Sequence, residues 1–355
     1  RTQPVTQSPF TGGAGIAGVL DELAILKKAL VDQDVLKIFN TQNPQKSAPL
    51  RNAKGQILQT RAIFDEGRGW MTKAGADETI RRIKKAGFNV YIPCVWHGQG
   101  TRYPSAIAQP EANVIFQEGD PFKYLIDIAH KNNIEIHPWF TVALRQREFL
   151  KEYYDEGTPN DAFNLHNPAF RQFIINLMVD VVERYKIDGI NLDYIRTMGI
   201  CKSSYCQDQY REMYARDLLD DLEKSNLNKR LREPVQNWID NAVEDVVRNV
   251  SVRGKSARKS LIVSVDGHPI PRHMEASSQG RNEVVWANKG LIDVIFYMDY
   301  QRAPDYDRLD LVQKELAAES NLLILIANYE GNPKNKIIAR KGNHLKELIA
   351  ASHNA

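Results

Sequence analysis

The stretch Tyr185-Lys-Ile-Asp-Gly-Ile-Asn-Leu-Asp-Tyr-Ile-Arg196 decides the fold class, because it joins a buried strand to a carboxylate at the strand's end. Side chains alternate along a strand, so Gly189, Asn191 and Asp193 share one face and the apolar residues between them share the other. The apolar face suits burial under helices. The polar face then points into a barrel and places Asp193 at the C-terminal end of the strand, where barrel enzymes carry out their chemistry.

Short apolar runs of strand type alternate with helical patterns along the chain. The runs occupy residues 61–66, 89–96, 134–141, 189–195, 261–266, 294–300 and 322–328. Such alternation predicts a parallel sheet covered by helices, and a length of 355 residues suits one TIM-type (β/α)₈ barrel with insertions. Only seven strands can be counted. The eighth lies beyond the C-terminus, is supplied by residues 40–58, or is absent from an open barrel, and the sequence leaves all three open.

The expected domain organisation is simple. Residues 1–58 form a polar lead-in with one helix at 21–39, and residues 59–355 form the barrel. A helical insertion at about 199–259 follows the fourth strand, so it is expected on the face where the strands end.

Composition excludes several functions. The 47 basic and 44 acidic residues nearly cancel, which gives no electrostatic reason to expect nucleic-acid binding. No apolar run is long enough to span a membrane. Cys94 is expected to be a buried thiol, whereas Cys201 and Cys206 form either a disulfide or two free thiols. No second ligand pair accompanies them, so neither a metal nor any other cofactor is expected, and the oligomeric state is undetermined.

Carboxylates recur where the predicted strands end. Besides Asp193, the main candidates are Asp266 and Asp299, and Asp65 and Glu66 end the first strand. Hydrolysis of a glycosidic bond needs two carboxyl groups, one to protonate the leaving oxygen and one to act as nucleophile or to activate water. We expect Asp193 to be the general acid and Asp299 or Asp266 to be its partner.

Aromatic and hydrogen-bonding side chains near the strand ends suit a sugar ligand, although core packing is the alternative for each aromatic ring. The residues expected to bind substrate are His137, Trp139, Trp96, Asn191, Tyr194, Arg196, Tyr297 and Glu330. Competing chemistries lack their motifs. The sequence has no Gly-x-Ser-x-Gly elbow, no phosphate-binding loop and no dinucleotide fingerprint.

Several of these segments resemble the glycosyl-hydrolase-like 10 family of bacterial envelope proteins. The resemblance covers roughly residues 60–330 and rests on motifs in a fixed order. These are Asn89-Val-Tyr-Ile-Pro, Gly100-Thr-Arg-Tyr-Pro-Ser105, Ile134-Glu-Ile-His-Pro-Trp-Phe140, Asn164-Leu-His-Asn-Pro-Ala169, the strand containing Asp193, and Trp286 to Tyr300.

The resemblance implies a TIM barrel that hydrolyses a cell-envelope or extracellular polysaccharide, with peptidoglycan glycan strands as one candidate. It points to Asp193, and more loosely to Asp299 and His137. The strand also looks like that of family 18 chitinases. There the present chain departs, with Asn191 and Ile195 in place of an aspartate and a glutamate. Tyr194 likewise replaces a second acid that relatives often carry.

Three functions therefore remain in view. The first is a glycoside hydrolase acting on a polysaccharide or oligosaccharide. The second is a non-catalytic glycan-binding barrel, and the third is an enzyme of another class, such as a polysaccharide deacetylase. The resemblance and the first residue, Arg1 rather than methionine, lead us to expect a periplasmic, outer-membrane-associated or secreted protein.

Overall fold

The computed structural model describes residues 60–227, 231–269, 277–317, 320–331 and 337–354. The lead-in of residues 1–58 and the helix expected at 21–39 therefore lie outside the described residues.

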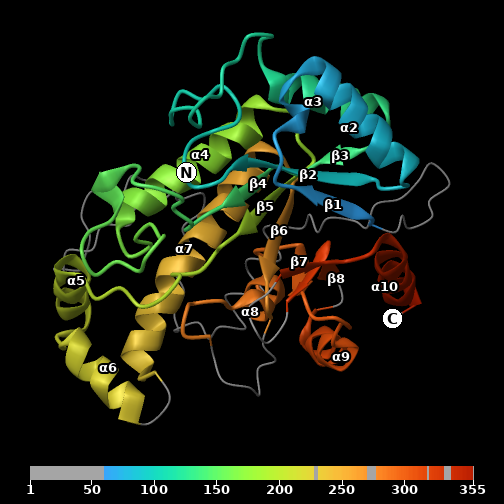
Figure 1. Ribbon diagram of the computed structural model, residues 1–355. Coiled ribbons are helices and arrows are strands. Elements are labelled where there is room, and N and C mark those ends of the chain that lie inside the picture. Colours follow the sequence, from blue (N-terminus) through green and yellow to red (C-terminus); the bar gives the residue numbers. More distant parts are fainter. Residues whose placement is uncertain (1–59, 228–230, 270–276, 318–319, 332–336, 355) are drawn as a thin grey trace, which may run out of the picture. The chain divides into compact units, whose positions relative to one another are not determined.

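A curled parallel sheet forms the centre of the fold (Figure 1). Every neighbouring pair of strands is parallel and each expected strand run is present. In spatial order the strands are β1 Ala62–Asp65, β2 Val90–Trp96, β4 Trp139–Thr141, β5 Gly189–Asp193, β6 Ile262–Gly267, β7 Val294–Asp299 and β8 Asn321–Ile326. Within the described part of the chain, β1 and β8 end the sheet, so the predicted TIM-type fold is confirmed with its eighth strand missing.

The expected third strand is divided into two pieces. β3, Glu135–Ile136, pairs with β2, and β4 continues the same path after His137 and Pro138. Proline has no backbone N–H to donate to a neighbouring strand, which explains the interruption. The Pro138 carbonyl still accepts a hydrogen bond from the Asn191 backbone at 3.0 Å, so β5 remains attached across the break.

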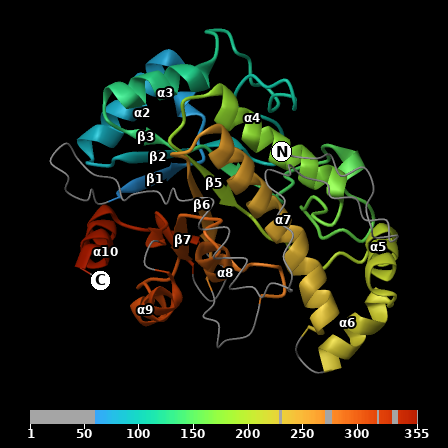
Figure 2. The same ribbon diagram turned by 180° about the vertical axis from the view of Figure 1, so that it is seen from behind.

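Helices follow most of the strands and lie against the outer face of the sheet. Figures 1 and 2 show α4 and α7 running side by side, and α2 and α3 together beside β1 to β3. The helices are α2 Lys73–Lys85, α3 Pro121–Lys131, α4 Pro168–Arg184, α5 Ser204–Tyr214, α6 Leu218–Leu227, α7 Glu233–Ala257, α8 Glu283–Asn288, α9 Tyr306–Glu315 and α10 Gly342–Asn354.

The remaining elements are short. Two 3₁₀ helices, η1 Gly69–Met71 and η2 Lys151–Tyr153, precede α2 and α4. An antiparallel hairpin of β9 Tyr329–Gly331 and β10 Ile337–Ala339 follows β8. None of the described helices combines the length and apolar character that crossing a bilayer requires.

The start of α4 shows how local sequence sets an element's boundary. The side chain of Asn167 accepts a hydrogen bond from the Ala169 backbone N–H at 2.9 Å, and Pro168 occupies the first helical position. This cap satisfies a backbone donor that the helix itself cannot pair, and the fixed φ of proline suits the first turn.

The segment that follows β5 contributes both a helical excursion and a barrel helix. α5 and α6 lie away from the sheet in both views, whereas α7 returns along α4 and buries Val243, Val246 and Val250 (Figures 1 and 2). The distal part of the excursion has its own small core, in which Trp238 packs edge-on against Tyr210.

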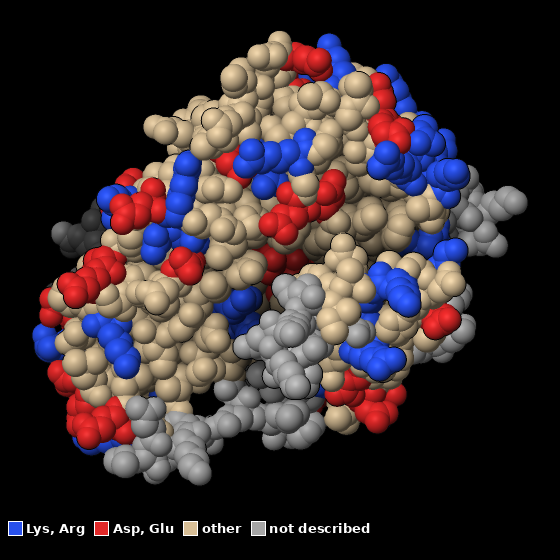
Figure 3. Space-filling view, viewed as in Figure 1, with Lys and Arg blue, Asp and Glu red and all other residues tan. Residues whose placement is uncertain are grey.

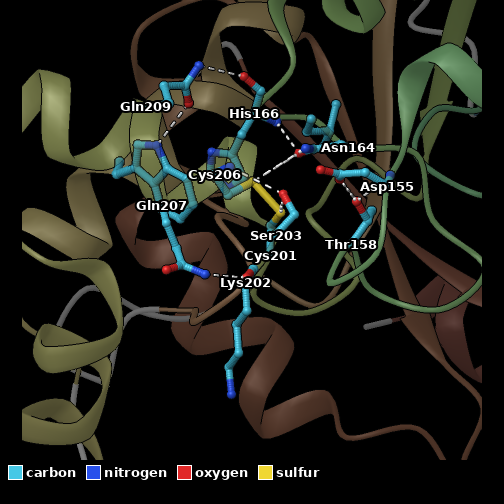
Figure 4. Close-up of a disulfide and its surroundings, with 12 residues drawn as sticks. Asp155, Thr158, Asn164, His166, Cys201, Lys202, Ser203, Cys206, Gln207 and Gln209 are labelled. Carbon is cyan, nitrogen blue, oxygen red and sulfur yellow. Dashed lines mark hydrogen bonds between the residues drawn. A yellow bond between two sulfur atoms is a disulfide. The ribbon is translucent and has the colours of Figure 1, made fainter.

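Cys201 and Cys206 are joined by a disulfide at the start of the excursion (Figure 4). The amide of Asn164 donates to the Cys206 sulfur at 3.3 Å, and the carbonyl oxygen of the Asn164 side chain accepts from the His166 backbone N–H at 2.9 Å. The His166 ring stacks on Trp238 with centroids 3.4 Å apart. The motif around Asn164 therefore anchors the excursion to the barrel. Cys94, by contrast, is a buried free thiol, as expected.

The inner face of the sheet is identified by a contact across its curvature. Phe64 of β1 meets Trp139 of β4 at 5.7 Å and Phe296 of β7 at 5.0 Å, both edge to face. These three strands are not neighbours, so the rings fill the interior of the curled sheet. They provide the apolar layer above which the strand ends carry their polar side chains.

Candidate active site

Asp193 ends β5 on the inner face of the sheet and is 6% exposed. Its Oδ2 accepts a hydrogen bond from the indole Nε1 of Trp139 at 3.2 Å, and its Oδ1 accepts from the Tyr194 backbone N–H at 2.6 Å. Burial raises the pKa of Asp193 to about 6, even though these hydrogen bonds and the charge of Arg196 act to lower it. A carboxyl group with this pKa can gain or lose a proton near neutral pH.

Asp266 is the carboxyl group that shares the interior with Asp193. β5 and β6 are in register from Gly189 with Ile262 to Leu192 with Val265, and the next step places Asp193 beside Asp266. Neighbouring strands lie about 4.8 Å apart. Burial raises the pKa of Asp266 well above its ordinary value, and the charge of Asp193 raises it further. Two buried carboxyl groups on adjacent strands disfavour each other's ionisation.

Asn191 organises the layer just below the pair. Its amide nitrogen donates to Asp266 Oδ1 at 3.0 Å and to Ser264 Oγ at 3.1 Å. It is fully buried, so its role is to orient Asp266 rather than to contact a ligand directly. The aspartate that family 18 chitinases carry at this position is thus replaced here by a hydrogen-bond donor to the neighbouring strand's acid.

Two tyrosines, Tyr300 and Tyr329, lie near the Asp193 and Asp266 carboxyl groups. Tyr300 follows β7, and its pKa is raised by burial and by the charges of Asp193 and Asp266. Tyr329 of β9 lies 5.4 Å from Tyr300 between ring centroids. Both tyrosines stand at the ends of strand-like runs, where the sequence leads us to expect aromatic rings that could stack on a sugar.

Glu66, one of the acids expected at the end of the first strand, lies beside His97, which the sequence reasoning did not single out. Glu66 follows β1, and its Oε1 lies 3.1 Å from Nε2 of His97, which follows β2. The His97 ring meets Trp139 edge to face at 6.3 Å. The charge of Glu66 raises the pKa of Asp193, so this exposed carboxylate belongs to the same electrostatic environment. His97 could have been identified from its place directly after a strand.

Asp299, the other expected partner, lies on the opposite face of the sheet. Phe296 points inward, so Asp299, three residues further along β7, points outward. Its two carboxyl oxygens accept hydrogen bonds from the backbone N–H groups of Gln301 at 3.0 Å and Asp305 at 2.7 Å. Asp299 therefore holds the turn between β7 and α9. Tyr297 shares this outer face and is buried.

Trp96 and His137 also lie away from the acid pair. The register between β2 and β4 shifts at Trp96, and its ring packs 5.8 Å from Phe173 of α4, in the helical layer. His137 is on the inner face but at the amino end of the strands, where its ring leaves room only for a glycine at 189. Four residues of strand separate that level from Asp193, which is about 13 Å.

Of the remaining expected ligands, Tyr194 and Arg196 lie at the rim. Tyr194 has a left-handed backbone conformation, φ 48°, which turns the chain sharply after Asp193. The Arg196 guanidinium lies 4.5 Å above the Tyr194 ring. Glu330 belongs to β9, but its side chain lies outside the described part of the structure. Figure 3 shows acidic side chains at the bottom and edge of a hollow over the central strands.

The strand ends thus bring together a coupled acid pair, an indole donor and several aromatic rings, on a barrel interior that opens to solvent at one face. This arrangement is typical of barrels that hydrolyse glycosidic bonds. The sequence matches the family described as Glycosyl hydrolase-like 10 over residues 65–339, and the chain belongs to that family.

The comparison with curated proteins finds "Glycosyl hydrolase YngK" of Bacillus subtilis (strain 168). It is 24% identical over 174 residues, which cover 42% of this chain and 34% of that protein. The chain therefore spans about a third of the length of this relative.

Solved structures share the fold. The glycoside hydrolase domain of PgaB (BpsB) from Bordetella bronchiseptica matches with a TM-score of 0.58 at 9% identity, covering 83% of this chain and 91% of that one. A β-galactosidase from Bacillus circulans sp. alkalophilus matches with a TM-score of 0.55 at 13% identity, covering 83% and 48%. At these identities the likeness extends to the TIM-barrel fold of glycoside hydrolases.

Proposed function

We propose that this protein hydrolyses O-glycosidic bonds of a polysaccharide with Asp193 and Asp266 as its catalytic carboxyl pair. The single observation that carries the proposal is the placement of these two buried, electrostatically coupled carboxyl groups side by side at the C-terminal ends of β5 and β6. Trp139, Tyr300 and Tyr329 surround the pair with faces on which sugar rings can stack.

The contacts of the pair favour a division of roles that differs from the sequence-based expectation. Asp193 accepts two N–H hydrogen bonds that stabilise its charged form, whereas Asp266 accepts from Asn191 at 3.0 Å and has the charge of Asp193 beside it. Asp266 therefore carries the proton and Asp193 carries the charge.

The reaction then proceeds in two balanced steps. The Asp266 carboxyl protonates the glycosidic oxygen while the bond from the anomeric carbon to that oxygen breaks, and the Asp193 carboxylate bonds to the anomeric carbon. Water next attacks that carbon, gives its proton to Asp266 and releases Asp193. This route requires carboxyl groups about 5–5.5 Å apart, which suits side chains on adjacent strands, whereas inversion requires ~6.5–9.5 Å.

Retention of anomeric configuration is the result expected of this geometry. Proton NMR of the first product released from an oligosaccharide, before mutarotation, measures it directly. Product of the same anomeric configuration as the substrate supports the pair as nucleophile and acid. Product of inverted configuration shows instead that a water molecule stands between the two carboxyl groups.

The pH dependence of kcat/KM follows from the same assignment. Activity is expected to rise with pH through about 6, as Asp193 ionises, and to fall at higher pH as Asp266 loses its proton. Glu66→Gln removes a charge that raises the pKa of Asp193, so the acidic limb is expected to move to lower pH. An acidic limb that stays in place in this variant, in a full pH profile, contradicts the assignment.

The substrate that we propose is a cell-envelope or extracellular polysaccharide, with peptidoglycan glycan strands among the candidates. The disulfide between Cys201 and Cys206 supports a periplasmic or extracellular location, because disulfides persist in oxidising compartments.

Release of new reducing ends from a polysaccharide panel that includes these glycan strands tests the function. Release above the level of heat-denatured protein is expected. Glycan binding without release would make the protein a carbohydrate-binding barrel, and release of acetate alone would make it a deacetylase.

A further inference from the structure

A cluster of arginines lies beside the acid pair and is not used in the mechanism. Arg196 follows β5, Arg281 lies two residues before α8 and Arg308 lies in the first turn of α9. The loops that carry the first two are joined, because the Thr197 backbone N–H donates to the Gln279 carbonyl at 3.1 Å. Segments far apart in sequence thus bring Arg196 and Arg281 to one part of the rim.

His268, just after β6, lies within electrostatic range of all three side chains. Burial, together with the charges of Arg281, Arg196 and Arg308, lowers the pKa of His268 to about 4. Burial and the charges of Arg196 and Arg308 lower the pKa of Arg281, although the charge of Glu283 acts to raise it. The imidazole is therefore neutral, and the cluster has the electrostatic character of an unbalanced positive site.

Within the described residues, none of the three guanidinium groups has a carboxylate at ion-pair distance. The Nε atoms of Arg281 and Arg308 are buried and lack a hydrogen-bond acceptor there. Arg196 contacts only the face of the Tyr194 ring. Buried guanidinium donors without acceptors are costly, and an anion is the partner that their planar, forked geometry fits.

Among the residues that the structure describes, Glu283 is the acid inside the cluster, and one carboxylate does not balance three guanidinium groups. It is 1% exposed, and its carboxyl group packs against the backbone of Gly267, where a Cβ atom would lie 2.1 Å from Oε1. Burial raises the pKa of Glu283 in spite of Arg281 and Arg196. Even when it is ionised, Glu283 supplies one negative charge against three positive ones, so the described part of the cluster keeps a net positive charge.

The geometry points to an anion subsite formed by Arg196, Arg281 and Arg308, which accepts a carboxylate or sulfate group of an acidic glycan. The inference rests on the proposed function for its substrate class, because Arg196 also acts on the charge of Asp193 and so connects the subsite to the acid pair. A glycan bound at the pair would extend its acidic sugar toward the arginines, where bidentate hydrogen bonds fix its position.

The test compares binding of acidic oligosaccharides with that of their neutral counterparts. The probes are oligouronates, sulfated oligosaccharides and peptide-free peptidoglycan glycan strands, each beside its carboxyl-reduced or desulfated form, titrated by calorimetry. The protein carries Asp193→Asn so that binding is measured without turnover. At least one acidic form is expected to bind ~10-fold or more tightly than its neutral counterpart, as charge-assisted hydrogen bonds allow. Whether the carboxylated or the sulfated oligosaccharides show the larger preference identifies the anionic group that the subsite accepts.

The Arg281→Gln/Arg308→Gln double variant is expected to lose this preference. Arg81→Gln/Arg82→Gln is its matched control, because both of these exposed arginines pair with Glu78 on α2, and it should keep the preference. Thermal unfolding of each variant checks that it folds. Equal binding of acidic and neutral forms, no binding of either, or equal loss in both double variants overturns the subsite.

The failure of this inference and the failure of the proposed function are distinguishable. If the wild type cleaves neutral and acidic glycans equally well, the proposed hydrolase activity is supported and the anion subsite is refuted. If the protein binds the acidic form more tightly but the wild type releases no reducing ends, the anion subsite is supported and the proposed hydrolase activity is refuted.

Discussion

Asp193→Asn is expected to lower kcat/KM for glycan hydrolysis by ~10⁴-fold or more, the scale of loss when a member of a catalytic unit is removed. The asparagine keeps the size of the side chain and can still accept one hydrogen bond from Trp139 or the Tyr194 backbone. It can neither ionise nor bond to an anomeric carbon. Initial rates of reducing-end release, for wild type and variant side by side, measure the loss.

Loss of folding is not an alternative explanation for that result. The pKa of Asp193 is raised in the folded state to about 6 from an ordinary 3.8, so its contribution to stability is present below pH 3.8 and is lost as pH rises through 6. Above that pH the buried charge costs on the order of 3 kcal/mol. The variant is therefore expected to unfold at the same or a higher temperature than wild type at pH 8.

Asp299→Asn is the matched control that tests whether Asp266, rather than Asp299, is the second carboxyl group of the catalytic pair. Its carboxyl group caps the turn after β7, so the variant is expected to lose about 1 kcal/mol of stability and to retain its activity per folded molecule. A loss of activity as large as that of Asp193→Asn would restore Asp299 to the catalytic pair.

Arg102→Met is expected to produce the largest loss of stability, about 3–5 kcal/mol, because it leaves a buried carboxylate without its main partner. Arg102 is 4% exposed and its Nε donates to Glu111 Oε2 at 2.7 Å. Its Nη1 also donates to the Glu66 carbonyl at 2.5 Å, which ties the loop after β1 to β2. Burial would raise the pKa of Glu111, but Arg102 and Arg68 outweigh it and lower that pKa.

Arg68→Met is the control for this prediction, since Arg68 pairs with the same Glu111 at 2.7 Å but is 47% exposed. Its removal is expected to cost about 1 kcal/mol or less, as for other solvent-exposed ion pairs. Urea unfolding of both variants measures the difference. Equal losses would show that the Arg102 contacts with backbone carbonyls do not add to the stability of the loop.

The fold could be predicted because the signals that specify a parallel barrel are local. Strands such as Val90–Trp96 are apolar on both faces, and Asn167 predicts the start of the helix at Pro168 because asparagine is a favoured N-cap. The identity of α7 as a neighbour of α4 depends on tertiary packing, and no pattern in a single segment of the sequence records it.

The candidate site could be predicted from the sequence only for strands in which particular residues show which side chains face the barrel interior. Gly189 and Asn191 fixed the inward face of β5, and Asp193 follows from them. For β7 the apolar run from Val294 gave no polar marker of its inner face, so Asp299 could not be assigned to the outer side without the contact between Phe296 and Phe64. The shift that turns Trp96 outward is equally invisible in the sequence.

A double-mutant cycle on the acid pair tests the central claim most directly. Initial rates would be measured for Asp193→Asn, Asp266→Asn and the double variant on a glycan that the wild type cleaves. If the two carboxyl groups act as one unit, each single variant loses nearly all activity and the double variant loses little more. Losses that add in free energy, or an Asp266→Asn variant as active as wild type, would contradict the account.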